Sequence, residues 1–146
     1  MSKVETAVAL FDKFNCAQSV FAAYGPEEGL EEPMCLMLAG PFGGGIGRMG
    51  EVCGALTGAL LVLSLRHGQG MATDPAEARG PFYERVQSFM NDFRLRNGGV
   101  TCRELTGCDL LSPEGQEQFK ARDLHHQLCR KLVASAAELL EKPEKG

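Results

Sequence analysis

Apolar residues recur at helical spacing along most of this chain, and no segment shows the alternation of apolar and polar residues that a half-buried strand requires. Near the N-terminus, Val4, Ala7, Val8 and Phe11 fall on one face of a helix that a capping box at Ser2 would begin. We therefore expect an all-α fold, built as a single compact bundle of about five to seven helices without significant sheet.

Caps, prolines and glycines mark where these helices begin and end. Gly25-Pro26 ends the first helix, and Gly80-Pro81 is expected to interrupt the segment that Asp74-Pro75 begins. The predicted helices cover about residues 3–24, 33–39, 49–66, 82–97, 102–107, 113–122 and 124–141. Residues 142–146 are expected to form a frayed tail.

The length and charge of the chain limit the classes of protein to which it can belong. The 146 residues suit one domain, so we expect a single helical domain over residues 1–146. The net charge of -4 argues against nucleic acid or an anionic membrane as the partner. The longest apolar run, residues 52–65, is too short to insert across a membrane, and the first residues lack a secretory signal. These features favour a cytoplasmic protein.

The cysteines are the unusual part of the composition: Cys16, Cys35, Cys53, Cys102, Cys108 and Cys129. In a reducing compartment such residues more often serve metal or redox chemistry than disulfides, although free cysteine also packs as a small hydrophobic residue. The chain has no C-x-x-C pair, no C-x-x-C-H haem motif and no ferredoxin-like run of cysteines. A metal or redox centre must therefore be assembled from distant segments.

A glycine-rich segment, GPFGGGIGRMG, precedes the most apolar part of the chain. Its letters match G-x-G-x-x-G, but no predicted strand or βαβ unit surrounds it, so we do not interpret it as a dinucleotide-binding loop. Gly43, Gly44, Gly45 and Gly47 permit positive φ and a close approach of the backbone to a neighbour, and Arg48 adds a charge beside them. These five residues are candidates for contacts with a cofactor.

Gly50, Gly54 and Gly58 are spaced to lie along one face of the helix predicted over residues 49–66. Each glycine in a helix costs about 1 kcal/mol relative to alanine, so a close contact must offset the loss. The close packing of another helix is the preferred explanation, and a bulky cofactor is the alternative.

Cys53 and Cys102 each fall at the start of a predicted helix, and Cys102 follows a capping box at Thr101. At such positions the unpaired N–H groups and the helix dipole favour an anion, so we expect the pKa of both thiols to be lowered. Arg48 would add to the effect at Cys53. The two residues are therefore the candidate redox-active thiols of a metal-free mechanism.

His125 and Cys129 occupy positions i and i+4 of the last predicted helix, a spacing at which both could ligate a metal. The preferred interpretation is simpler. His125 and His126 are adjacent, so their side chains point in different directions and suit an ordinary solvated pair.

Four stretches of the chain together resemble the bacterial and archaeal family of redox-active proteins named for its C_GCAxxG_C_C cysteine pattern. They are NCAQSVFAAYG, FGGGIGRMGEVCGALTGALLVL, CRELTGCDLLSPEG and the late LC before a C-terminal helix. The resemblance implies a small all-helical protein whose recurrent cysteines are matched by Cys16, Cys53, Cys102 and Cys129, with Cys108 as a fifth. A related module is joined to haem domains in some electron-transfer proteins, so the resemblance also implies an iron–sulfur centre.

Two residues stand apart from this pattern. Cys35 lies outside the matching stretches and is expected to pack in the core. Arg130 follows the last cysteine at a position where the family often has proline, so Cys129 is expected to lie within a helix rather than at its start.

Three functions are compatible with these features. The leading hypothesis is an electron-transfer protein, rather than a turnover enzyme, whose cysteines ligate an iron–sulfur cluster or another metal and which acts on an unidentified redox partner protein. The second is a metal-free thiol–disulfide redox protein, with Cys53 as the attacking thiolate and Cys102 or Cys16 as the resolving partner. The third is a non-enzymatic interaction module, a homodimer formed through a glycine or Met/Leu helix face.

Overall fold

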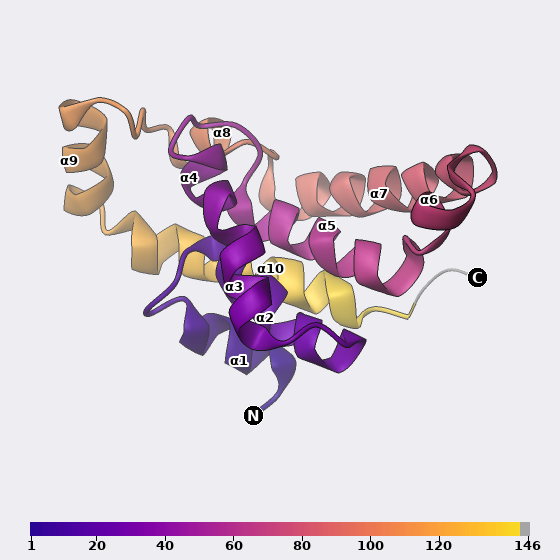
Figure 1. Ribbon diagram of the computed structural model, residues 1–146. Helices are drawn as coiled ribbons and strands as arrows, with labels where there is room; N and C mark the ends of the chain where they lie inside the picture. The colour runs from indigo at the N-terminus through magenta and orange to yellow at the C-terminus, as the bar shows by residue number, and fades with distance from the viewer. Residues whose placement is uncertain (144–146) are drawn as a thin grey trace.

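Helices of seven or more residues carry most of the fold in the computed structural model, which describes residues 1–143 (Figure 1). They are α1 (Lys3–Leu10), α2 (Cys16–Tyr24), α3 (Glu32–Ala39), α5 (Gly54–His67), α7 (Pro75–Asn97), α9 (Pro113–Ala121) and α10 (Arg130–Glu141). The shorter α-helices are α4 (Gly43–Ile46), α6 (Gly70–Thr73) and α8 (Cys102–Thr106). The connections include two 3₁₀ turns, η1 (Gly25–Glu28) and η2 (Gly40–Phe42), and a π-helical turn, η3 (His125–Cys129).

Strand pairing in residues 1–143 is limited to an isolated bridge between Val52 and Thr101. The prediction of an all-α fold without significant sheet is therefore confirmed, and the seven longer helices of the described chain agree with the expected number. The single turns α4 and α6 were not expected, because their short, glycine-containing segments carry no helical apolar pattern.

The core is organised around α2, in which seven of nine residues are buried. This helix packs against α1, α3, α5 and α10. Its last residue, Tyr24, is fully buried, and its hydroxyl oxygen lies 3.1 Å from the Ala137 carbonyl oxygen and 2.8 Å from Glu141 Oε1. The same core contains large side chains from three other helices, including Leu56, Phe93 and Val133.

Two glycines allow α5 to lie directly against α2. A Cβ atom on Gly58 would lie 2.6 Å from the Ala17 carbonyl oxygen, and one on Gly54 would lie 3.1 Å from Cys16 Cβ. The expectation that the glycine face serves helix packing is confirmed for these two residues. Gly50 does not belong to that face, because it precedes the helix and has a φ of 74°.

The predicted helix over residues 3–24 is wrong, because the chain forms two helices there. Residues 11–15 separate the two helices, and Asn15 is the N-cap of the second. Its side chain accepts a hydrogen bond from the Gln18 N–H, and the Gln18 side chain accepts one from the Asn15 N–H. This capping box begins α2 at Cys16. The cysteine is thus the first residue of a helix, not a late residue of a longer one.

Other predicted boundaries also change. The helix expected from residue 49 begins at Gly54, because the backbone has positive φ at Gly50 and pairs at Val52. Gly80-Pro81 does not break α7, in which Pro81 is exposed. A proline removes one intrahelical hydrogen bond, and a carbonyl freed at the surface can bind water instead.

The last predicted helix is confirmed, with one local difference: the π-helical turn η3 leads directly into α10. Residues 144–146 of the predicted frayed tail lie outside the described residues. Among the helices of residues 1–143, none combines the length and the apolar character needed to cross a bilayer.

Candidate functional site

Two of the candidate cysteines are the first residues of helices that begin with capping boxes. Cys16 follows the Asn15 box described above, and Cys102 follows a box in which the Thr101 side chain accepts from the Glu104 N–H. The Glu104 side chain in turn accepts from the Thr101 N–H at 3.1 Å. Such boxes fix the direction of the first helical turn, so the two thiols are held by rigid local structure.

Backbone hydrogen bonds hold Cys53 and Cys102 on neighbouring segments. Around the bridge between Val52 and Thr101, the Cys53 N–H donates to the Val100 carbonyl at 2.8 Å. The Cys102 N–H donates to the Glu51 carbonyl at 2.7 Å. Cys53 is the N-cap residue of α5 rather than a residue of its first turn. The bridge therefore aligns the starts of α5 and α8.

Cys129 comes from the π-helical turn η3 and meets Cys16 across the core. The interaction of the Cys16 and Cys129 thiols raises the pKa of Cys16 well above its usual range and lowers the pKa of Cys129. Burial also raises the pKa of Cys16 and opposes the lowering at Cys129. The expectation that Cys129 lies within a helical segment is confirmed, because α10 continues directly from it.

The four sulfurs lie close enough for their charges to act on one another. Negative charge at Cys53, Cys129 or Cys102 raises the pKa of Cys16, and charge at Cys102 or Cys129 raises that of Cys53. Charge at Cys129 likewise contributes to the raised pKa of Cys102. We call Cys16, Cys53, Cys102 and Cys129 the four-cysteine cluster. It gathers residues from the starts of α2, α5 and α8 and from η3.

The expectation that helix starts lower the pKa of Cys53 and Cys102 is wrong. Burial raises the pKa of Cys53 to about 12, although the backbone amides of Ala55 and Leu56 act in the opposite direction. Burial also raises the pKa of Cys102 to about 11. Cys53 is only 3% exposed and Cys102 9%, so the loss of hydration outweighs the favourable helix terminus.

The glycine-rich loop packs directly onto this cluster. Gly45 has a φ of 71°, and a Cβ atom there would lie 2.6 Å from Cys102 Cβ and 2.7 Å from the Glu51 nitrogen. A Cβ on Gly43 would lie 2.6 Å from Asn15 Nδ2. The loop thus covers the start of α8 and the cap of α2, and α4 and α8 lie side by side (Figure 1).

The remaining candidate residues of the loop have different surroundings. Gly44 has a φ of 66°, and a Cβ there would meet the Arg48 side chain at 2.8 Å. Gly47 has a φ of 56° and open space around the position of a Cβ. Arg48 is exposed and also has a positive φ. Cofactor contacts by these five residues remain a prediction.

Cys108 and Cys35 occupy different surroundings. Cys108 is buried near Cys102, and its thiol lies 3.5 Å from the Thr106 carbonyl oxygen. Charge on it contributes to the raised pKa of Cys102. Cys35 is fully buried in the hydrophobic core, where its thiol donates to the Leu30 carbonyl at 3.3 Å, which agrees with the expected packing role.

The two adjacent histidines have separate partners. The His125 ring stacks on Phe11 with their centroids 4.1 Å apart. His126 Nδ1 lies 2.7 Å from Asp123 Oδ1. These contacts favour the interpretation of the histidines as ordinary side chains over a shared metal site of His125 and Cys129.

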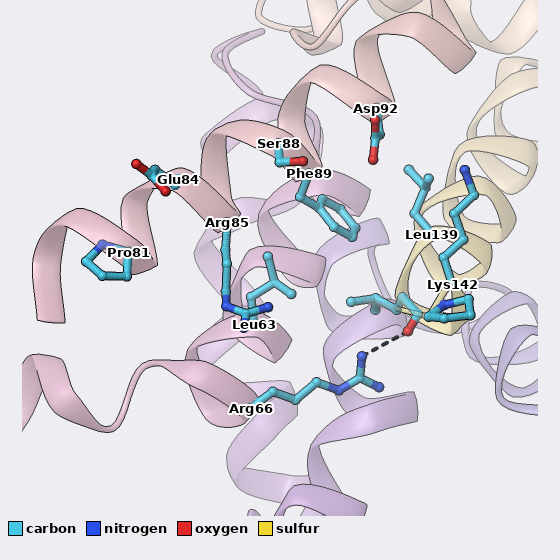
Figure 2. A pocket seen from close by; sticks show the side chains of 12 residues that line it. Leu63, Arg66, Pro81, Glu84, Arg85, Ser88, Phe89, Asp92, Leu139 and Lys142 are labelled. Carbon is cyan, nitrogen blue, oxygen red and sulfur yellow. Dashed lines mark hydrogen bonds between the residues drawn. The ribbon is translucent and has the colours of Figure 1, made fainter. Parts of the chain in front are cut away.

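All six cysteines are free thiols. Within residues 1–143, no three His, Cys, Asp or Glu side chains surround a common point as the ligands of one metal ion. A cleft of about 490 Å³ lies elsewhere, between α5, α7 and α10 (Figure 2). Its lining includes Leu63, Phe89 and Arg66, whose Nη1 donates to the Leu140 carbonyl at 2.9 Å, and it contains none of the cysteines.

Comparison with known proteins gives the cluster a family context. A family described as "Putative redox-active protein (C_GCAxxG_C_C)" matches residues 14–143, a range that includes all six cysteines. The chain belongs to this family. An uncharacterized protein of Archaeoglobus fulgidus is 31% identical to this family member in a 133-residue alignment that covers 86% of the present chain and 81% of the relative. No solved structure matches the chain significantly.

Asn15 and Gln18 are the positioning residues that the sequence interpretation missed. Their capping box places Cys16 at a helix start, and the Gln18 side chain also donates to the Leu36 carbonyl at 2.9 Å. The signal was available in the stretch NCAQ, which has the cap residue and the glutamine at the spacing of a capping box.

Proposed function

We propose that this protein transfers electrons through an iron–sulfur cluster, or another thiolate-bound metal centre, held by Cys16, Cys53, Cys102 and Cys129. The observation that carries the proposal is the approach of four thiols from four separate elements of the fold. Four cysteines are the usual ligand set of [2Fe–2S] and [4Fe–4S] clusters. Membership of a family described as redox-active points the same way.

The surroundings of the thiols suit a bound cation. Burial makes ionisation of Cys53 and Cys102 costly, and a metal ion offsets this cost because a coordinating thiol loses its proton. The backbone amides of Ala55 and Leu56 favour negative charge on the Cys53 sulfur. When bound, such a centre would supply one-electron redox chemistry, and amides near its sulfurs would adjust the reduction potential.

An iron–sulfur cluster requires a different arrangement of its ligands from that of a single metal ion. Its irons are several, and each cysteine binds one of them, so the four sulfurs need not surround one point. The glycine-rich loop supports the proposal, because Gly45 brings backbone rather than a side chain against Cys102. Gly43, Gly44, Gly47 and Arg48 belong to the same loop and are proposed to complete the surroundings of the centre.

Anaerobic purification and cluster reconstitution test the proposal. We expect the wild-type protein to be brown and to contain iron and acid-labile sulfide. Cys129→Ser should lose most of both, whereas Cys35→Ser, which alters another buried thiol outside the four-cysteine cluster, should retain them. A wild-type protein that stays colourless after anaerobic reconstitution would contradict the proposal.

The interaction of the Cys16 and Cys129 thiols, which shifts their pKa values in opposite directions, favours a second candidate, a metal-free dithiol–disulfide couple of these two residues. Its reaction would remove one proton and one electron from each thiol, form the Cys16–Cys129 bond and reduce a disulfide of a partner to two thiols. This pairing replaces the one predicted from sequence, because the raised pKa of Cys53 makes it a poor attacking thiolate.

Thiol counting separates the two candidates. After mild oxidation with a small disulfide, the second candidate predicts the loss of two titratable thiols from the wild-type chain and a Cys16–Cys129 link in peptide mapping. Cys108→Ser should behave as the wild type in this assay. An unchanged thiol count in the metal-free protein would exclude the couple.

A further inference from the structure

The exposed apolar side chains of this protein are concentrated in one short part of the chain. Nine large hydrophobic residues of the described range are exposed, and five of them lie between residues 34 and 49. We call these five the methionine face: Met34, Met37, Leu38, Ile46 and Met49. Exposed apolar residues scattered singly are ordinary, whereas a concentration of them in one short segment marks a candidate interaction site.

The two parts of the methionine face follow one another closely along the chain and are joined by a short, hydrogen-bonded connection. α3 buries Cys35 and Ala39 against α2 and turns Met34, Met37 and Leu38 outward. The chain then passes through η2 into α4, and Figure 1 shows α3 leading up to α4 on the near side of α2.

Hydrogen bonds hold the second part of the face in place. The Gly47 N–H donates to the Pro41 carbonyl at 2.8 Å, and the Arg48 N–H donates to the Gly43 carbonyl at 3.2 Å. Asn15 Nδ2 donates to the Gly40 carbonyl at 3.1 Å. The segment that carries Ile46 and Met49 is therefore tied to the end of α3.

Opposite charges lie at the two ends of the face. Glu31 and Glu32 are exposed at the start of α3, and Arg48 is exposed between Ile46 and Met49. In the part of the chain that the structure describes, ion pairs within 4.0 Å involve other residues, such as Lys3 with Glu27 and Arg66 with Glu28. Glu31, Glu32 and Arg48 have no such partner among residues 1–143.

We propose that the methionine face is the interface of a homodimer, in which a second copy of this chain binds across a two-fold axis. A two-fold axis that runs across the face, perpendicular to the line from Glu31 to Arg48, places each end of the face on the opposite end of the other copy. Glu31 and Glu32 of one copy would therefore meet Arg48 of the other, twice in each dimer. Methionine side chains are flexible and fill irregular gaps, which suits the apolar centre of such an interface. The proposal does not depend on what the four-cysteine cluster binds.

Light scattering on the full chain, combined with size-exclusion chromatography, gives the first test. We expect a dimer for the wild type and a monomer for Met37→Lys, which places a charge at the most exposed residue of the face. Leu95→Lys is the matched control, because Leu95 is 84% exposed on α7, and it should remain dimeric. A wild-type chain that is monomeric up to its solubility limit would overturn the proposal, whether or not the face binds a different protein.

A charge exchange tests the arrangement of the two copies. We expect self-association to weaken by about tenfold or more in each of two variants: the single variant Arg48→Glu and the double variant Glu31→Lys/Glu32→Lys. In each case the homodimer would bring like charges together. Mixing the two variants should restore dimers, since the glutamate introduced in one copy would face the two lysines introduced in the other. Native mass spectrometry of variants with different tags would detect them. Failure of the mixture to form heterodimers would overturn the two-fold arrangement.

Discussion

At the scale of single residues, Cys16 shows best what a local pattern can and cannot predict. The chain contains the signal for a helix start at Cys16, because Asn15 and Gln18 form a capping box. No local pattern predicts its interaction with Cys129, since the two residues come together only when α2 and η3 pack together. The raised pKa of Cys53 is equally hidden, because it follows from burial in the assembled core.

Gly45 is the residue of the loop whose replacement should cost most stability. Gly45→Ala would place a methyl group 2.6 Å from Cys102 Cβ in a backbone with a φ of 71°. We expect a loss of about 2–4 kcal/mol in the free energy of unfolding, from strain and from the clash together. Chemical denaturation followed by circular dichroism measures it.

Gly47→Ala is the matched control for this substitution. Gly47 also has a positive φ, of 56°, but a Cβ there would have open space around it. Only the strain of a positive φ remains, so we expect Gly47→Ala to lower the free energy of unfolding by about 1 kcal/mol. Equal losses for the two variants would show that the loop does not press against Cys102 as described.

The buried hydroxyl of Tyr24 predicts a dependence of stability on alkaline pH. Burial, followed by the hydrogen bond to Glu141, raises the pKa of Tyr24 above its usual value of 10.0. A raised pKa means that the folded state holds the proton more tightly, so this stability is present below pH 10 and is lost as pH rises further. The advantage of the wild type over Tyr24→Phe in free energy of unfolding should therefore shrink above pH 10. A difference that stays constant between pH 8 and about 11.5 would contradict this account.

At the scale of whole elements, the sequence interpretation succeeds where a boundary is set by neighbouring residues. The capping box at Thr101 and Glu104 predicts α8, and Ser112-Pro113 predicts the start of α9. It fails at Gly80-Pro81, because the helix-breaking tendency of proline is overridden within the long exposed helix α7. It also fails at the start of α5, which the bridge of Val52 with Thr101 delays to Gly54.

The packing of α2 on α5 makes a prediction opposite to helix propensity. Alanine favours a helix over glycine by about 1 kcal/mol. Gly58→Ala should nevertheless lower the free energy of unfolding by about 1–3 kcal/mol, because its Cβ would lie 2.6 Å from the Ala17 carbonyl oxygen. Thermal and urea unfolding give the value.

Ser64→Ala provides the comparison within the same helix. Ser64 is exposed on α5, and its replacement by a better helix former should leave stability unchanged or raise it by about 0.5 kcal/mol. If Gly58→Ala were also stabilising, the close approach of α2 and α5 would be wrong.

At the scale of the whole molecule, the fold class follows from helical periodicity, whereas the site follows from topology. The apolar pattern predicts an all-α chain, and the described residues form one. The four-cysteine cluster draws on α2, α5, α8 and η3, so its formation depends on how the bundle assembles rather than on the spacing of residues. The family resemblance predicted which cysteines belong together, and in the structure charge at Cys53, Cys102 or Cys129 acts on Cys16.

The most direct test of the central claim is to measure iron and acid-labile sulfide per chain in single Cys→Ser variants after identical anaerobic reconstitution. If Cys16, Cys53, Cys102 and Cys129 hold one centre, each of these four variants should lose most of its iron and sulfide, while Cys35→Ser should match the wild type. Wild-type iron and sulfide in two or more of the four variants would contradict the claim that these residues form a single site.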